Sequence, residues 1–362
     1  MPFRPKLLAV TALAGSAVVA GAGAPASAQT SSETGNVEAL SRHHGDLHDL
    51  LTRLGQVHGV LLGELAREGE AVRERGDTLP TAGFDDATVE RLIDALRDDG
   101  RVDRLARGAA EGYRALGPRA SEVLRRGQSF QHEVLSILSD PEVADRSAAL
   151  DAALARYRSR PDVALPAVPK DMDVLYGHPH ALAFRTHYPQ LDGLVWSGHW
   201  LRLAATEPLT DLTAGPERQA GIDTVTARFH AKLSFGEPPQ AFPSELPLAP
   251  AIAPGFIWYS PESAMVWDNL SMLMEVLGDI LASPETTDVE ASLEATLDFF
   301  LDPEQAVTDR DEWEIMALRH GIFFQGGFPL AVMTENERNA GMHAAHLAGG
   351  APLMVIPGMP RR

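Results

Sequence analysis

The chain has 362 residues, a formal net charge of −19 at pH 7 and no cysteine. Without cysteine it has no disulfides, no thiolate-bound metal and no covalently attached haem, so any metal must be held by His, Asp, Glu or Met. The acidic balance repels phosphate backbones and anionic lipid surfaces, which makes nucleic acid and such membranes poor partners.

Residues 1–28 have the pattern of a secretory signal peptide. A basic start at Arg4 and Lys6 precedes the apolar, small-residue run LLAVTALAGSAVVAGAGA, and Ala26-Ser27-Ala28 supplies the small residues that a signal peptidase accepts. We therefore expect these residues to be removed and the mature protein to be periplasmic or secreted. No later stretch approaches the roughly 20 apolar residues of a membrane helix, so we expect no membrane anchor after cleavage.

Composition divides the mature chain into two regions. Residues 29–165 contain neither Trp nor Met, whereas residues 166–362 hold all five Trp and the nine Met of the mature chain. The segment RSRPDVALPAVPKD (158–171), with three prolines, is the natural boundary. Helical patterns dominate both regions and alternating strand patterns are scarce. We predict a mainly α fold, a multi-helix bundle with long N-terminal helices and an aromatic-rich C-terminal helical body, whose two regions are separate domains or parts of one.

The first expected helix begins near Leu40 and carries a heptad seam. Leucine or histidine recurs at alternating steps of four and three, which is typical of a packing surface between helices. The seam residues are Leu40, His44, Leu47, Leu51, Leu54, His58, Leu61 and Leu65. His44 and His48 are four residues apart, so their imidazoles would project from one helical face and could bind one metal ion. Alternatively, these histidines are core residues hydrogen-bonded to another helix, since an unpaired buried imidazole costs about 1–3 kcal/mol.

The stretch YGHPHALAFRTHYPQLDGLVWSGHW (176–200) holds four of the 13 histidines and two of the five tryptophans. Pro179 favours an extended conformation at the preceding residue, which would place two of the histidines on one face. A helix after Pro189 would add a third histidine and a carboxylate that binds a metal directly or orients a ligand. The predicted metal ligands are His178, His180, His187 and His199, with Asp192 in support. The alternative is an aromatic core with hydrogen-bonded histidines.

The rest of the C-terminal region contains a Pro-rich segment (236–255), which we expect to be irregular, and two further helices. In the helix over 262–282, which Ser260 and Pro261 begin, Asp268, Glu275 and Asp279 lie along one face. We expect this acidic face to be solvated. In the last helix, His343 and His346 are three residues apart, a spacing found at metal sites in helical bundles.

Two functions agree with these observations. The first is an exported helical metalloprotein, a redox or hydrolytic enzyme or a metal carrier, that holds Fe, Cu or Zn through converging imidazoles. A non-covalent haem is a variant of it, with Trp196 and Trp200 flanking the flat ligand. The second is a non-catalytic binding or scaffolding protein in which the histidines are structural. Its partner would be a metal ion, a small molecule or another protein.

Overall fold

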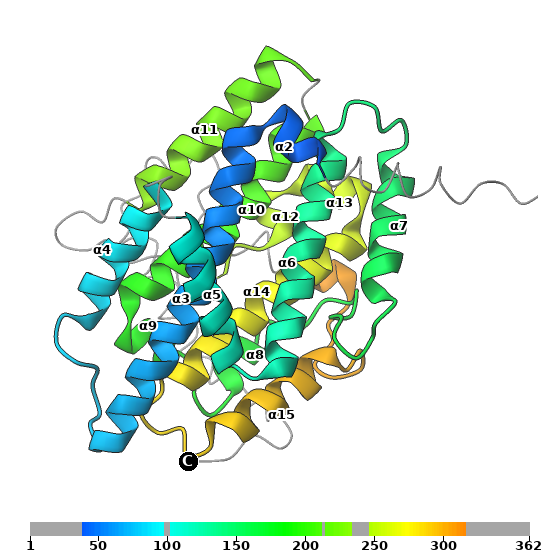
Figure 1. Cartoon of the computed structure of the whole chain (residues 1–362). Coiled ribbons are helices and arrows are strands. Elements are labelled where there is room, and N and C mark those ends of the chain that lie inside the picture. Colours follow the sequence, from blue (N-terminus) through cyan, green and yellow to red (C-terminus); the bar gives the residue numbers. More distant parts are fainter. Residues whose placement is uncertain (1–37, 98–101, 212–213, 234–245, 316–362) are drawn as a thin grey trace, which may run out of the picture.

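The computed structural model describes residues 38–97, 102–211, 214–233 and 246–315, which form a mainly helical body (Figure 1). In chain order the helices are α2 (Ala39–His43), α3 (Gly45–Arg75), α4 (Phe84–Arg97), α5 (Val102–Ala115), α6 (Pro118–Ser139), α7 (Arg146–Arg158), α8 (Val174–Gly177), α9 (Ala183–His187), α10 (Pro189–Asp211), α11 (Pro216–Lys232), α12 (Ala249–Ile252), α13 (Pro254–Tyr259), α14 (Pro261–Ala282) and α15 (Val289–Leu301). The predicted mainly α fold is confirmed. No helix in these ranges combines the length and the apolar character that crossing a membrane requires.

Helix α14 lies in the interior and packs against α3, α6, α9 and α15 (Figure 1). Every residue from Ser263 to Ala282 except Glu275 is buried. A helix that is buried on nearly all sides must be surrounded by other helices. Its first helical residue is Pro261 and its N-cap is Ser260, where the sequence predicts the start.

The heptad seam is a buried packing surface, but it runs over two helices. At His44 the backbone leaves the helical region, with φ −143° and ψ 58°, and α3 begins at the next residue, Gly45. Glycine costs about 1 kcal/mol relative to alanine inside a helix, which makes this an easy place to interrupt one. The leucines of the seam are buried and so is His58, whereas His44 is only half-buried. The expectation of one continuous helix through this imidazole is wrong.

Helices α3 and α5 touch through glycines, and this contact fixes one wall of the candidate site. A Cβ atom at Gly112 would lie 1.8 Å from the carbonyl oxygen of Gly59, and one at Gly63 would lie 2.7 Å from the Cα atom of Gly112. No side chain fits at such distances, so the two backbones approach closely only because these residues are glycine. Helix α5 therefore occupies the glycine face of α3.

The Pro-rich boundary at 158–171 is packed against the C-terminal half of the chain. The Asn269 side chain on α14 donates to the carbonyl oxygens of Pro166 and Val168, at 2.9 and 2.8 Å. The buried Lys170 ammonium donates to backbone carbonyls at the end of α15, among them those of Asp302 and Gln305, both at 2.6 Å. One cluster of buried hydrophobic residues includes side chains from both composition regions.

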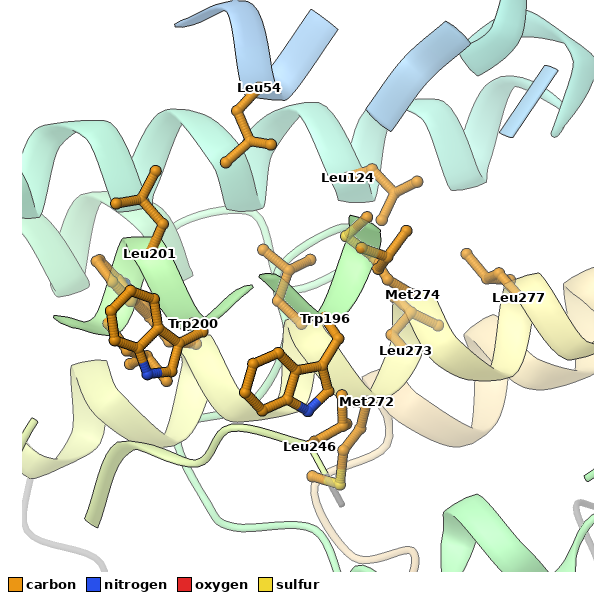
Figure 2. Packing of buried hydrophobic residues seen from close by; sticks show 14 of the residues in the cluster. Leu54, Leu124, Trp196, Trp200, Leu201, Leu246, Met272, Leu273, Met274 and Leu277 are labelled. Atoms are coloured by element: carbon orange, nitrogen blue, oxygen red, sulfur yellow. The ribbon is translucent and has the colours of Figure 1, made fainter. Parts of the chain in front are cut away.

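Trp196 and Trp200 of α10 are buried side chains of this cluster (Figure 2). They lie one turn apart, and Leu246 and Met272 lie beside Trp196 in the same view. The Lys232 ammonium at the end of α11 lies 5.3 Å from the ring centroid of Trp196 and 4.6 Å from that of Trp200. Cation–π attraction to both indoles thus attaches α11 to α10.

Candidate functional site

The structure distributes the histidines of the 176–200 stretch over separate places. His178 and His180 both reach the C-terminal end of α14, where His178 Nε2 lies 3.1 Å from Asp279 Oδ2 and His180 Nδ1 lies 3.1 Å from Ser283 Oγ. His187 is half-buried, and burial lowers its pKa against the opposing effect of the Glu285 carboxylate. The first two imidazoles therefore hold the α8–α9 segment against α14.

The two histidines at the start of the first expected helix also diverge. His44 Nδ1 lies 3.0 Å from Gln219 Oε1 on α11. His48 Nδ1 lies 2.9 Å from Asp49 Oδ1, and its ring makes an edge contact with the ring of His132 on α6. The helix break at His44 separates the two directions. His343 and His346 lie outside the described residues.

Among the residues that the structure describes, no group of three or more His, Asp or Glu side chains is arranged to hold a metal ion. A metal centre built from the predicted ligands therefore stays a prediction. The fold does, however, bury several polar side chains without hydrogen-bond partners among these residues.

Two histidines in the core, His58 and His199, are buried polar groups of this kind. His58 of α3 and His199 of α10 are both buried, with ring centroids 5.8 Å apart and ring planes at 90°. None of their four ring nitrogens has a hydrogen-bond partner within the described chain. Gly198 makes room for the pair, since a Cβ there would lie 2.7 Å from His58 Nε2. The expectation that a buried seam imidazole is hydrogen-bonded is wrong for His58.

Both imidazoles are neutral because of their surroundings. Burial lowers the pKa of His199 to about 3 and that of His58 well below its usual range, and the positive charge of Arg202 lowers both further. An imidazolium in this place would be desolvated and next to another cation. The pair is thus a rigid, uncharged contact that positions α10 on α3.

Arg202 itself is the most unusual group of the fold. Its guanidinium is buried, and its hydrogen bond runs from Nη1 to the Gly198 carbonyl of its own helix at 3.3 Å. Burial lowers its pKa to about 10, and Tyr113 is the group that acts in the opposite direction. No carboxylate within the described residues pairs with it. Burying a cation without a partner costs free energy of folding, so such a residue indicates a place where a ligand could supply the missing negative charge.

Arg202 lines a cavity of about 280 Å³ between α3, α5 and α6. Its lining combines apolar surface with polar side chains, which include Thr52, Gln56, Tyr113, Arg125, Gln128, Ser129, Gln131 and His132. The Tyr113 hydroxyl donates to the Gly55 carbonyl at 3.0 Å and accepts from Gln128 Nε2 at 2.5 Å, which ties the three helices together at the cavity wall. Burial raises the pKa of Tyr113, so it stays a neutral phenol. The cavity combines one buried cation with amide and hydroxyl groups.

A second polar cavity, of about 30 Å³, lies between α9, α10 and α14. Its lining includes Asp192, Glu275, Asp279 and Arg185, and Arg185 Nη1 lies 3.6 Å from Asp192 Oδ2. Asp192 and Glu275 share a hydrogen bond; burial raises the pKa of Asp192 to about 6 and that of Glu275 well above its usual range. This volume is large enough for about two water molecules, since each needs about 10–15 Å³.

The expectation that the acidic face of α14 is solvated is therefore wrong. Asp279 accepts hydrogen bonds from the backbone N–H groups of Leu182 and Phe184 at 3.1 and 2.8 Å, and Asp268 accepts from Ala249 N and from Trp313 Nε1. These two side chains hold the N-terminal ends of α9 and α12, and the Trp313 side chain, against α14. The backbone N–H groups at the N-terminal ends of α9 and α12 have no acceptor within their own helix, so they require such partners, which explains acidic residues inside the core.

Sequence reasoning did not identify the residues around the 280 Å³ cavity, namely Arg202, Tyr113, Gln128 and His132. One signal was present, because Arg202 stands alone among apolar residues in the run WLRLAA. A charge on an otherwise apolar helix is seldom buried without a reason. The other residues had no local signal, since their proximity depends on the packing of three helices.

Comparison with protein-family models, with curated proteins and with solved structures finds no match to this chain.

Proposed function

We propose that the protein is an exported binding protein for a small anionic molecule, which binds in the cavity at Arg202 through its carboxylate or phosphate group. The observation that carries the proposal is the buried guanidinium, which faces a polar cavity and has no carboxylate partner among the described residues. The proposal takes up the second function from the sequence, a non-catalytic binding protein, and specifies a small anion as its ligand.

The physical reason is charge compensation. Burial lowers the pKa of Arg202 to about 10, so the group remains a cation near pH 7 but is less stable than in water. A carboxylate or phosphate in the cavity would neutralise it and accept two parallel hydrogen bonds from the planar guanidinium. Arg202 is itself buried, and charge-assisted bonds to a buried group are stronger than the same bonds at the surface.

The cavity also limits the ligand. A volume of about 280 Å³ is just below the usual range of ligand sites, roughly 300–1,000 Å³, so the ligand must be small. Amide and hydroxyl groups from Gln128, Gln131, Thr52 and Ser129 favour a ligand with polar atoms beyond its anionic group. The net charge of −19 repels anions at long range, so selective binding must arise from local contacts with Arg202.

The test is calorimetric titration of the mature protein with acetate, succinate, citrate and inorganic phosphate. We expect at least one of these anions to bind the wild type, and Arg202→Gln to weaken that anion by about 30-fold or more, since truncating one partner of a buried charge pair costs about 2–5 kcal/mol. Arg160→Gln is the matched control, because Arg160 is exposed, does not line the cavity and is already paired with Asp162 at 3.0 and 2.7 Å; its replacement should leave anion binding unchanged. Equal binding by the Arg202 variant, or binding of none of the anions by the wild type, would overturn the proposal.

A further inference from the structure

The edge of the same cavity brings together two histidines that the sequence keeps far apart. His48 of α3 and His132 of α6 have ring centroids 5.1 Å apart and ring planes at 74°. The side chain of His48 is 26 % exposed and His132 is half-buried, so the pair is accessible to a small ion. His132 also lines the cavity.

Asp49 gives His48 the arrangement of a metal ligand. Its Oδ1 atom lies 2.9 Å from His48 Nδ1 and accepts the proton that Nδ1 carries in the neutral ring. That hydrogen bond fixes the tautomer and leaves Nε2 with a lone pair. A carboxylate behind a histidine in this way is the usual support for a metal-binding imidazole.

The separation of the rings agrees with coordination of one ion by both. Zinc binds imidazole nitrogen at about 2.0–2.1 Å with tetrahedral angles, and this geometry places the two ring centroids about 5 Å apart. The observed centroid distance of 5.1 Å agrees with this value. The acidic chain, at −19, also raises the local concentration of cations.

From these observations we propose that His48 and His132 bind a divalent transition-metal ion, of which Zn²⁺ is the model, with Asp49 as a positioning residue. The other coordination positions hold water or an anionic ligand, because the described residues bring no third His or carboxylate to the ion. Such a site shares open coordination positions with catalytic zinc, although it has two protein ligands where catalytic zinc has three. The proposal does not depend on the anion proposed for Arg202.

The test is titration of the metal-free mature protein with Zn²⁺ in a buffer without carboxylates or phosphate. We expect one zinc per chain, and His48→Asn or His132→Asn to weaken that zinc at least tenfold. Asp49→Asn should weaken it about 10–100-fold, the usual effect of removing such a supporting carboxylate. His44→Asn is the control, since His44 contacts Gln219 on α11 and should leave zinc affinity unchanged.

A second readout separates site loss from misfolding. X-ray absorption at the zinc edge should show two imidazole nitrogens at about 2.0–2.1 Å in the wild type. Circular dichroism of each variant should match the wild type. Wild type without stoichiometric zinc, zinc without imidazole ligands, or unchanged affinity in folded His48→Asn and His132→Asn would overturn the proposal. Arg202→Gln should still bind zinc, so failure of the anion proposal remains distinguishable.

Discussion

Replacement of Arg202 by methionine should make the ligand-free protein more stable. Methionine has a similar length and fits an apolar environment, so the variant removes the buried charge without leaving a large cavity. Stability would rise because the variant removes a buried charge that burial disfavours. Loss of function with gain of stability is typical of groups placed for a ligand.

The magnitude follows from the electrostatics of the site. Burial lowers the pKa of Arg202 from its ordinary value to about 10, which corresponds to roughly 3 kcal/mol of destabilisation of the charged form, because one pKa unit is worth about 1.4 kcal/mol. The hydrogen bond to the Gly198 carbonyl, at 3.3 Å, is lost and offsets about 1 kcal/mol of this. The expected net gain is therefore about 1–2 kcal/mol.

The assay is equilibrium unfolding in guanidinium chloride at pH 7, followed by circular dichroism and extrapolated to zero denaturant. Arg202→Met should unfold at higher denaturant concentration than the wild type, and Arg202→Lys, which keeps the charge, should not. The reasoning is refuted if Arg202→Met is less stable than the wild type by about 1 kcal/mol or more, the size of one lost hydrogen bond. That result would mean that the chain itself neutralises the guanidinium.

Three further predictions concern folding, pH and export. Gly112→Ala should destabilise the protein by several kcal/mol in thermal unfolding, because its Cβ would lie 1.8 Å from the Gly59 carbonyl oxygen, whereas Gly55→Ala, with its nearest atom at 3.8 Å, should be tolerated. Burial raises the pKa of Asp268 to about 8, so the folded state keeps a proton that the unfolded state loses near pH 4. Stability should fall by up to about 1.4 kcal/mol per pH unit from about pH 4 to about pH 8 in denaturant titrations, and Asp268→Asn should flatten this slope. Intact-mass measurement of the secreted protein should show cleavage after Ala28, and retention of the first 28 residues in a membrane fraction would contradict this.

The helices and the buried seam could be predicted because burial repeats with the helical period. From Leu47 to Leu65 the pattern identifies the face of α3 that meets the core, and Ser260 with Pro261 identifies the start of α14. Both signals are local, since they depend only on neighbours along one helix. The break at His44 was missed because its backbone conformation does not alter the spacing of apolar residues.

The candidate site could be predicted only in part, because contacts between helices set its composition. The sequence marked His48 as a metal ligand but paired it with His44, whereas packing of α3 on α6 brings His132 to it. It marked His199 as a ligand, and the fold places this ring against His58. Spacing along the chain cannot distinguish these partners.

Average composition also gave a wrong expectation for α14. In an acidic chain most carboxylates are solvated, and the sequence pattern of Asp268 and Asp279 does not differ from that of a surface stripe. They are buried because the first N–H groups of the short helices α9 and α12 lack acceptors within their own helices, among them those of Phe184 and Ala249. Which N–H groups lack an acceptor is decided by the tertiary structure, so the sequence pattern of α14 does not reveal it.

A crystal structure of the mature protein with the tightest-binding anion of the titrations tests the central claim most directly. The proposal predicts two oxygens of a carboxylate or phosphate about 2.7–3.0 Å from the Arg202 guanidinium nitrogens, inside the cavity that Tyr113 and Gln128 line. An anion bound elsewhere, or a carboxylate of the chain itself in contact with Arg202, would contradict it.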